Sequence, residues 1–372
     1  MPSVFAVLGC LLICVVVHDA FEVMLLPRRV RRQLRLVRIF FRVTWWPWSA
    51  VGNRLQPGDI RDAFLSLYGP LSLLLLLLLW ATALIFGFGI LQWALDAETM
   101  HSSLPHQLYF SGVTFFTLGY GDITPQTPLS KVAAVIEAGT GLGFIAVVIG
   151  YLPVLYQLFS RREAHVIQLD ARAGSPPTAA TLLCRHERGG GLDDMYTLLR
   201  SWEQWSAELV ESHLSYPMLS YYRSQHDNES WLAALAAVMD ACALLMVGLK
   251  GMRTFQARMT FAAGRLAVVE LSRVFQVAPE TKIQRLTHDG FSGLHRKLAE
   301  AGIAFEDEAE AEHELEAFRN TYEPFLHGLA RHLVLQLPTW FSSDDDLDNW
   351  QRSPRGRSAK RLVETAATKN DT

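Results

Sequence analysis

Long apolar stretches alternate with polar segments over the first part of the chain. A helix needs about 20 mainly apolar residues to cross the ~30 Å hydrocarbon layer of a bilayer. The first stretch reaches that length only if its helix continues past His18, Asp19 and Glu22. The pattern therefore predicts three membrane-spanning helices, at residues 1–26, 64–95 and 130–159.

A basic segment, residues 27–62, separates the first two stretches. One arc of a helix collects four of its arginines, and apolar side chains occupy the opposite arc. These four are Arg31, Arg35, Arg38 and Arg42. Tryptophans follow on both sides of Pro47, a residue that we expect to end the helix. Because tryptophan favours the headgroup zone and arginine favours anionic lipid, we interpret the segment as a cytoplasmic helix on the membrane surface.

Basic residues also predict the orientation, because they stay on the cytoplasmic side of a membrane. By this rule residues 27–62 and the pair Arg161-Arg162 both lie inside. The amino terminus is then outside and the carboxyl terminus is cytoplasmic. We expect a multi-pass protein of the plasma (cell inner) membrane.

A short apolar segment, residues 104–117, lies between the second and third spans. Its roughly 13 residues cannot cross a bilayer as a helix. The sequence Thr117-Leu118-Gly119-Tyr120-Gly121-Asp122 follows. Glycine tolerates positive φ, so an alternating backbone can turn successive carbonyls the same way. Carbonyls that point at one axis can replace the water shell of a cation, and such non-helical backbone survives at membrane depth where protein or a water-filled cavity surrounds it.

The stretch TFFTLGYGDITP at residues 114–125 resembles the pore signature of potassium channels, with Leu118 where valine is commonest. The resemblance covers residues 64–160. It implies a pore domain over residues 63–160, with an outer helix at 64–95, a pore helix at 104–117, a selectivity filter at 117–122 and an inner helix at 130–159. The permeant potassium ion would be held by four carbonyls, those of Thr117, Leu118, Gly119 and Tyr120.

The same resemblance implies roles for neighbouring residues. Gly121 completes the filter, Tyr120 packs its ring against the pore helix, and Asp122 holds the filter from behind. Glu137 lies at membrane depth, where a carboxylate needs a partner; we expect a contact with the pore helix, Thr117 or Asp122. One filter strand cannot encircle an ion, and the chain has a single copy, so a homotetramer is implied.

Small residues and a proline interrupt the inner helix. Gly141 lies at the offset where potassium channels often hinge, with Gly143 beside it and Pro153 as a second weak point. The alternative is that these glycines only allow close helix packing. Leu142 and Ile149 would line the cavity together with Ile145.

The remaining chain reads as cytoplasmic and helical. We expect a linker at 161–191, a helical domain at 192–341 and a disordered tail at 342–372. Its helices are predicted at about 192–222, 229–248, 253–277, 280–301 and 306–334. Strand alternation and the G-x-G-x-x-G motif of a nucleotide-binding regulatory domain are both missing from the pattern.

Three stretches of this part allow two interpretations each. Residues 231–249 are either a fourth span or, as we favour, a buried helix around Asp240. Residues 221–229 have possible ligand-binding chemistry, but a turn with Asp227 or Asn228 as N-cap suits them better. The acidic run 306–316 could suggest calcium, yet it lacks the spacing of an EF-hand and fits a solvated helix face.

Composition narrows the classes further. Charged residues make up 19% of the chain, below the ~25% of soluble proteins. The four cysteines are scattered without metal-ligand spacing, so we expect reduced thiols and no metal centre. No cofactor other than the permeant potassium, no nucleic-acid partner and no enzymatic activity are expected.

The sequence thus predicts an all-α membrane protein that conducts potassium passively. Two rival functions stay open: an active potassium-uptake subunit, and a non-conducting scaffold or lipid sensor. A voltage-sensing arginine helix is a further alternative for the basic segment, because arginines recur there at every third position. For His18, Asp19 and Glu22 the choice lies between pairing at the membrane interface and a buried contact with a neighbouring helix that biases gating.

Overall fold

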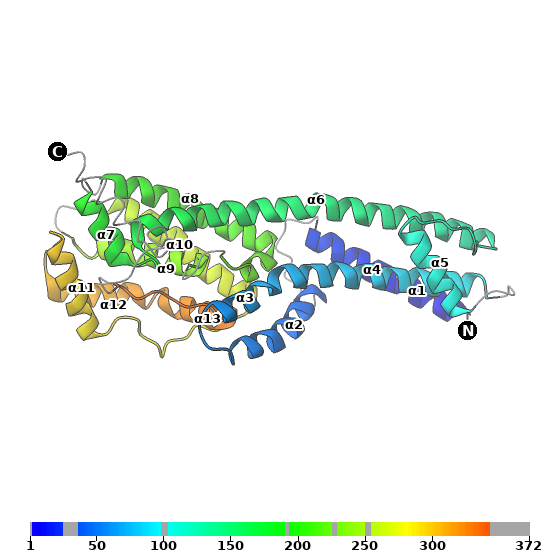
Figure 1. Cartoon of the computed structure of the whole chain (residues 1–372), viewed down its shortest axis with the longest axis horizontal. Helices are drawn as coiled ribbons and strands as arrows, with labels where there is room; N and C mark the ends of the chain where they lie inside the picture. The colour runs from blue at the N-terminus through cyan, green and yellow to red at the C-terminus, as the bar shows by residue number, and fades with distance from the viewer. Residues whose placement is uncertain are drawn as a thin grey trace, which may run out of the picture. The chain divides into compact units, whose positions relative to one another are not determined.

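A computed structural model describes residues 2–24, 36–97, 103–189, 193–224, 229–249 and 254–342 of the chain. Within these ranges the regular elements are helices (Figure 1), and the only β pairing is one isolated bridge between Leu249 and Phe305. The described chain forms two compact units. Unit 1 comprises residues 1–50 and 67–157, and unit 2 comprises residues 51–66 and 158–372.

Unit 1 contains the apolar helices. They are α1 (Pro2–Met24), α4 (Tyr68–Leu95), the short α5 (Leu104–Phe115) and the first part of α6 (Pro128–Ala173). Among the described residues, three stretches are long and apolar enough to cross a membrane: α1, Ile60–Leu95 and α6. The all-α fold and the three predicted spans are therefore confirmed, although the third helix extends well beyond the predicted residue 159.

Close backbone contact joins α1 to α4, and the two helices lie side by side in Figure 1. A Cβ added to Gly9 would lie 2.8 Å from the carbonyl oxygen of Gly87. Small residues at such a crossing let helices approach closely in lipid, where hydrophobic driving force between them is weak. One turn before Gly9 on α1, the ring of Phe5 meets that of Trp93 edge to face at 5.0 Å.

Helix α2 (Leu36–Gly52) differs from the prediction, because Pro47 lies inside it. The expectation that Pro47 ends the helix is wrong. Trp45 and Trp48 lie on either side of the proline and both pack against Tyr68, at 4.7 and 5.8 Å between ring centroids. This packing offsets the hydrogen bond that proline removes. Arg38 and Arg42 lie on α2, whereas Arg31 and Arg35 fall outside the described residues.

Unit 2 is a helical domain built around α9 (Trp231–Met246). Every α9 residue except Met246 is buried. The neighbours that cover it are α7 (Ala179–Arg188), α8 (Asp193–Ser215), α10 (Phe255–Phe275), α12 (Glu308–Arg319) and α13 (Glu323–Leu333). The interpretation of residues 231–249 as a buried helix is therefore confirmed. Helices α3 (Asp59–Ser66) and α11 (His288–Glu300) complete the unit.

The predicted linker at 161–191 is wrong in detail. Helix α6 continues to Ala173, and α7 begins after Thr178, whose hydroxyl accepts a hydrogen bond from the Thr181 amide. The apolar face of α7 is buried in unit 2, so the segment belongs to the domain despite its glycines and prolines. Residues 343–372, which include most of the predicted disordered tail, lie outside the described residues.

Several helix boundaries in unit 2 also differ from the prediction. The helix predicted at 280–301 begins only at His288, and the helix predicted at 306–334 is two helices, α12 and α13. The first predicted helix ends at Ser215 and is followed by the 3-10 helix η1 (Pro217–Tyr221). Ser230, not Asp227 or Asn228, caps α9 by accepting from the amide of Ala233; residues 225–228 lie outside the described part.

Candidate ion-conducting site

The segment after α5 has the alternating backbone that the sequence predicts. Thr117, Gly119 and Gly121 have φ angles of 56°, 61° and 77°. Left-handed φ costs little for glycine but is unusual for a β-branched residue such as threonine. Residues in such strained conformations cluster at functional sites. Every second residue of the predicted filter is thus turned into the left-handed region.

The end of α5 fixes the start of this segment. The amide of Leu118 donates to the carbonyl of Val113 at 2.8 Å, and the amide of Thr117 donates to that of Thr114 at 3.0 Å. These bonds satisfy carbonyls that the helix end leaves unpaired. They also orient the filter relative to the pore helix.

The side chains of the segment are largely uncovered within one chain. Leu118 is 55% exposed and Tyr120 is 67% exposed. Most of the Tyr120 side chain is therefore left uncovered by its own chain. Exposed apolar side chains that form a patch mark a site of contact with membrane or with another protein.

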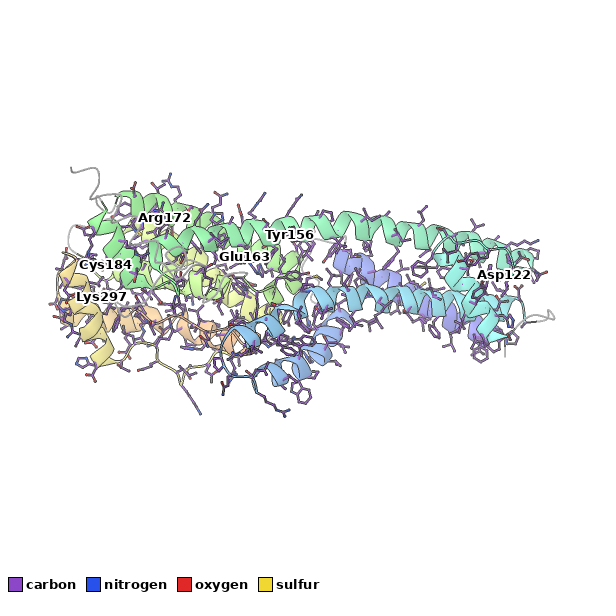
Figure 2. The ribbon with its side chains drawn as sticks, viewed as in Figure 1. Asp122, Tyr156, Glu163, Arg172, Cys184 and Lys297 are labelled. Atoms are coloured by element: carbon purple, nitrogen blue, oxygen red, sulfur yellow. The ribbon has the colours of Figure 1, made fainter. Side chains whose placement is uncertain are left out.

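Asp122, labelled in Figure 2, lies after the filter and contacts the predicted pore helix α5 through Tyr109. Its carboxylate accepts a hydrogen bond from the Tyr109 hydroxyl. Farther along, the buried carboxylate of Asp96 accepts from the amides of Thr127, at 3.2 Å, and Gln126, at 3.4 Å. This role of Asp96 was not predicted from the sequence. The two carboxylates tie down both ends of the connection from filter to inner helix.

Glu137 links three helices of unit 1. It is fully buried and accepts a hydrogen bond from the Ser111 hydroxyl on α5. Ser111 also lies 2.8 Å from the carbonyl oxygen of Ile85 on α4. The sequence predicts the pore helix, Thr117 and Asp122 as candidate partners of Glu137. The partner in the structure is on the pore helix. Ser111 was missed because a lone serine in an apolar helix carries no distinctive pattern.

Gly141 packs against the backbone of the pore helix. A Cβ added there would lie 2.0 Å from the carbonyl oxygen of Phe115. Gly143 has open space around it within the chain, and α6 continues as a helix through both glycines and Pro153. The sequence left two interpretations of Gly141 open, a hinge and close helix packing. The contact with Phe115 supports close packing.

Asp19 makes a buried contact within unit 1. Its carboxylate accepts a hydrogen bond of 3.0 Å from the indole nitrogen of Trp80 on α4. His18 and Glu22 lie 3.8 Å apart on one face of α1. The sequence left two interpretations of these polar groups, pairing at the membrane interface and contact with a neighbouring helix. Asp19 makes the contact with a neighbouring helix. Among the described residues no group of three His, Cys, Asp or Glu side chains is placed to hold a metal ion.

Comparison with known proteins agrees with this geometry. Residues 72–157 match the family model described as "Ion channel". An uncharacterized membrane protein of Bacillus subtilis, YdjJ, is 26% identical over 69% of this chain and 78% of its own length. The voltage-gated potassium channel regulatory subunit KCNF1 of Rattus norvegicus is 27% identical over 37% of this chain. Two-pore potassium channel 4 of Arabidopsis thaliana is 38% identical over 18% of it.

The last two matches cover 30% and 19% of those proteins, so this chain is similar to only part of each. No solved structure matches the chain significantly. The class defined by fold and site is that of membrane ion channels with a helical pore module. Within that class, this chain is similar to potassium channel proteins over part of its length.

Proposed function

We propose that four copies of the chain form a potassium-selective channel that conducts passively across the plasma membrane. The observation that carries the proposal is the alternation of positive φ at Thr117, Gly119 and Gly121 in a segment anchored to a half-length helix. Such alternation turns successive carbonyls to one side, and carbonyl rings can replace the hydration shell of potassium. One strand cannot form a ring, so the assembly is a homotetramer.

The exposed side chains support an assembly of several chains. Leu118 and Tyr120 project from the filter, and Leu142 and Ile149 are 61% and 67% exposed on α6. In the tetramer the first pair packs against a neighbouring pore helix and the second pair lines an apolar cavity. Asp122 and Glu137 act as filter supports through their contacts with Tyr109 and Ser111.

Potassium flux into liposomes that contain the purified protein tests the proposal. The wild-type chain should carry potassium and reject sodium, because the carbonyl filter matches the larger dehydrated ion. Gly119→Ala should abolish the flux and leave the tetramer assembled, since Gly119 has a positive φ with open space around it. Equal passage of sodium and potassium by the wild type, or a monomer in lipid, would refute the proposal.

A second candidate is a regulatory subunit that conducts only together with another channel protein. The rat relative is a regulatory subunit, and this similarity favours the second candidate. Silent wild-type protein that gains conduction when mixed with a conducting partner would support it. Potassium accumulation against a gradient would instead indicate the active-uptake alternative.

The proposed orientation places the amino terminus outside and the carboxyl terminus in the cytoplasm. Arg31, Arg35, Arg38 and Arg42 then face the cytoplasmic leaflet, where each basic residue near anionic lipid contributes about 1 kcal/mol. Replacing Arg38 and Arg42 together by glutamine should weaken binding of a peptide spanning residues 27–62 to phosphatidylserine vesicles and leave binding to neutral vesicles unchanged. Equal binding of both peptides to anionic vesicles would contradict the lipid-facing role.

A further inference from the structure

The cytoplasmic ends of two helices that frame the proposed pore are held by one short loop of unit 2. This loop consists of Tyr222 and Arg223, which follow η1. Its first residue binds α6, the inner helix, and its second residue binds α3, the helix that leads into the outer helix α4. All of these contacts lie within unit 2.

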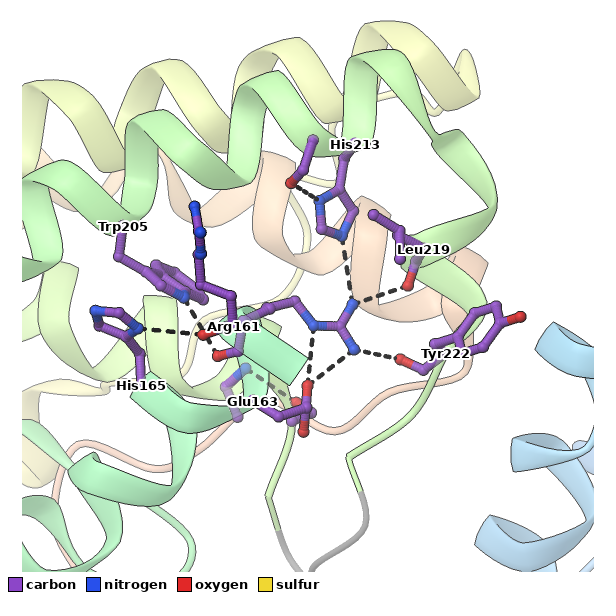
Figure 3. Close-up of polar contacts among 11 residues, drawn as sticks. Arg161, Glu163, His165, Trp205, His213, Leu219 and Tyr222 are labelled. Atoms are coloured by element: carbon purple, nitrogen blue, oxygen red, sulfur yellow. Dashed lines mark hydrogen bonds and ion pairs between the residues drawn. The ribbon is translucent and has the colours of Figure 1, made fainter. Parts of the chain in front are cut away.

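Arg162 on α6 provides the first attachment. Its buried guanidinium donates to the carbonyl oxygens of Tyr222, at 2.6 Å, and Leu219, at 2.8 Å. It also pairs with Glu163 at 2.9 Å and lies 5.3 Å from the ring centre of Phe159. Figure 3 shows Glu163, His213, Leu219 and Tyr222 arranged around this guanidinium. A planar group with five donors suits such a multiple contact, and lysine could not reproduce it.

His213 completes the enclosure of Arg162 and must be neutral to do so. Its Nε2 accepts from the guanidinium at 3.3 Å, while its Nδ1–H donates to the Leu209 carbonyl at 2.9 Å. Burial, and secondly the charge of Arg162, lower the pKa of His213 well below 6.5. The attachment therefore persists at physiological pH.

Arg223 provides the second attachment. It forms an ion pair of 2.6 Å with Asp62 on α3 and donates to the carbonyl oxygens of Leu333 and Val334 at the end of α13. Arg61, adjacent to Asp62, donates to the same Val334 carbonyl at 3.4 Å. The carboxyl end of a helix carries partial negative charge, so two guanidinium groups are favourable there. Helix α3 is thus tied both to the loop and to α13.

We propose that Arg162, Tyr222 and Arg223 form a clamp through which the helical domain of unit 2 controls opening of the pore. The clamp couples α3 and α6, since both attach to adjacent residues of a single loop. A movement of the domain must therefore displace both helices together. The inference rests on the proposed function, because it requires that α4 and α6 frame an ion pathway. It assigns Arg162 and Arg223 as positioning residues, since neither touches the ion.

Two measurements on the full-length protein test the clamp. The first is hydrogen–deuterium exchange in α3 and in residues 158–173 for Arg223→Gln, with Arg273→Gln as a matched control. Arg273 pairs with Glu270 on α10 and its side chain is 70% exposed. Because Arg223 bonds no α6 atom, faster exchange in residues 158–173 of the Arg223 variant alone would demonstrate the coupling. Faster exchange confined to α3 and α13 would show a local structural role and overturn the clamp.

The second measurement is single-channel recording of the same variants together with Arg162→Gln. Arg162→Gln and Arg223→Gln should change the open probability in the same direction, each by about five-fold or more, and the double variant should add little. Arg273→Gln should leave it unchanged. Wild-type open probability in Arg223→Gln would overturn the clamp. If the wild type itself conducts no potassium, the proposed function fails, and the exchange experiment still decides whether the clamp exists.

Discussion

At the scale of single residues, the pore region depends on a few close contacts between side chains and backbone. Gly141 lies where the inner helix meets the Phe115 carbonyl, and Glu137 meets Ser111 one turn earlier along α6. The sequence singled out both positions, Gly141 through its distance from the filter and Glu137 through its charge in an apolar helix. It could not supply their partners, because a backbone carbonyl and a lone serine leave no pattern in a sequence.

The two glycines of α6 allow a matched test of packing against bending. Gly141→Ala should destabilise the assembled protein by about 1–3 kcal/mol, because the new methyl group overlaps the Phe115 carbonyl. Gly143→Ala adds a methyl group in open space and should be neutral or stabilising by up to about 1 kcal/mol through better helix propensity. Thermal unfolding in detergent measures both. Equal loss of stability and of flux in the two variants would instead favour a hinge that needs both glycines.

At the scale of elements, the central helix of unit 2 shows how a charge can lie in an apolar helix. Asp240 is fully buried in α9, where Arg285 binds it at 2.7 Å and the Tyr322 hydroxyl donates to it at 2.5 Å. Arg285 also pairs with Glu323 on α13 at 2.9 Å. The guanidinium lies 5.6 Å from the ring centre of Trp340. This network satisfies the charge that α9 buries among its apolar side chains.

Removing Arg285 should therefore destabilise unit 2 strongly. Arg285→Met leaves Asp240 buried without its ion pair, and such losses cost about 3–5 kcal/mol. Arg331→Gln is the matched control, because Arg331 pairs with Glu280 and its side chain is 66% exposed; it should change stability by less than about 0.5 kcal/mol. Urea unfolding followed by tryptophan fluorescence compares them. Similar midpoints for both variants would show that the buried network contributes little.

At the scale of the whole molecule, two histidines with lowered pKa values make the stability of the folded chain depend on pH. His332 on α13 lies against Phe275, at 5.3 Å between ring centroids, and burial lowers its pKa to about 4. An unfolded chain takes up the proton near 6.5, whereas the folded chain resists it until about 4. The neutral form is thus favoured by folding, and stability falls as the pH drops from about 6.5 to about 4. Burial lowers the pKa of His213 in the same direction.

His332→Phe tests this dependence, because phenylalanine keeps the aromatic packing and cannot take up a proton. The melting temperature of the wild type should be lower at about pH 5 than at about pH 7. This drop in melting temperature should be smaller in the variant, because the variant has one fewer group that takes up a proton on unfolding. The identical drop in wild type and variant would show that His332 does not contribute to acid destabilisation.

The sequence by itself determined the elements whose signal is local. Apolar stretches of membrane length predicted the three spans, and a half-length helix followed by Gly-Tyr-Gly predicted the filter backbone, because span length and glycine freedom depend on few neighbouring residues. Pro47 and the linker with α7 were misjudged for the opposite reason. At Pro47, the packing of Trp45 and Trp48 on Tyr68 outweighs the tendency of proline to end a helix. In the predicted linker, burial of the apolar face of α7 outweighs the effect of the nearby glycines and prolines.

Only the tertiary structure decided which distant residues meet. The residues of each such pair are separated by tens of residues or more in the sequence. The pairs are Asp240 with Arg285, Asp19 with Trp80, Arg162 with Tyr222, and Asp62 with Arg223. A charge in a sequence shows that a partner is needed, since an unpaired buried charge is costly, but many partners satisfy that need equally well. Helix packing selects one of them, because it fixes which faces of which helices come within hydrogen-bond distance.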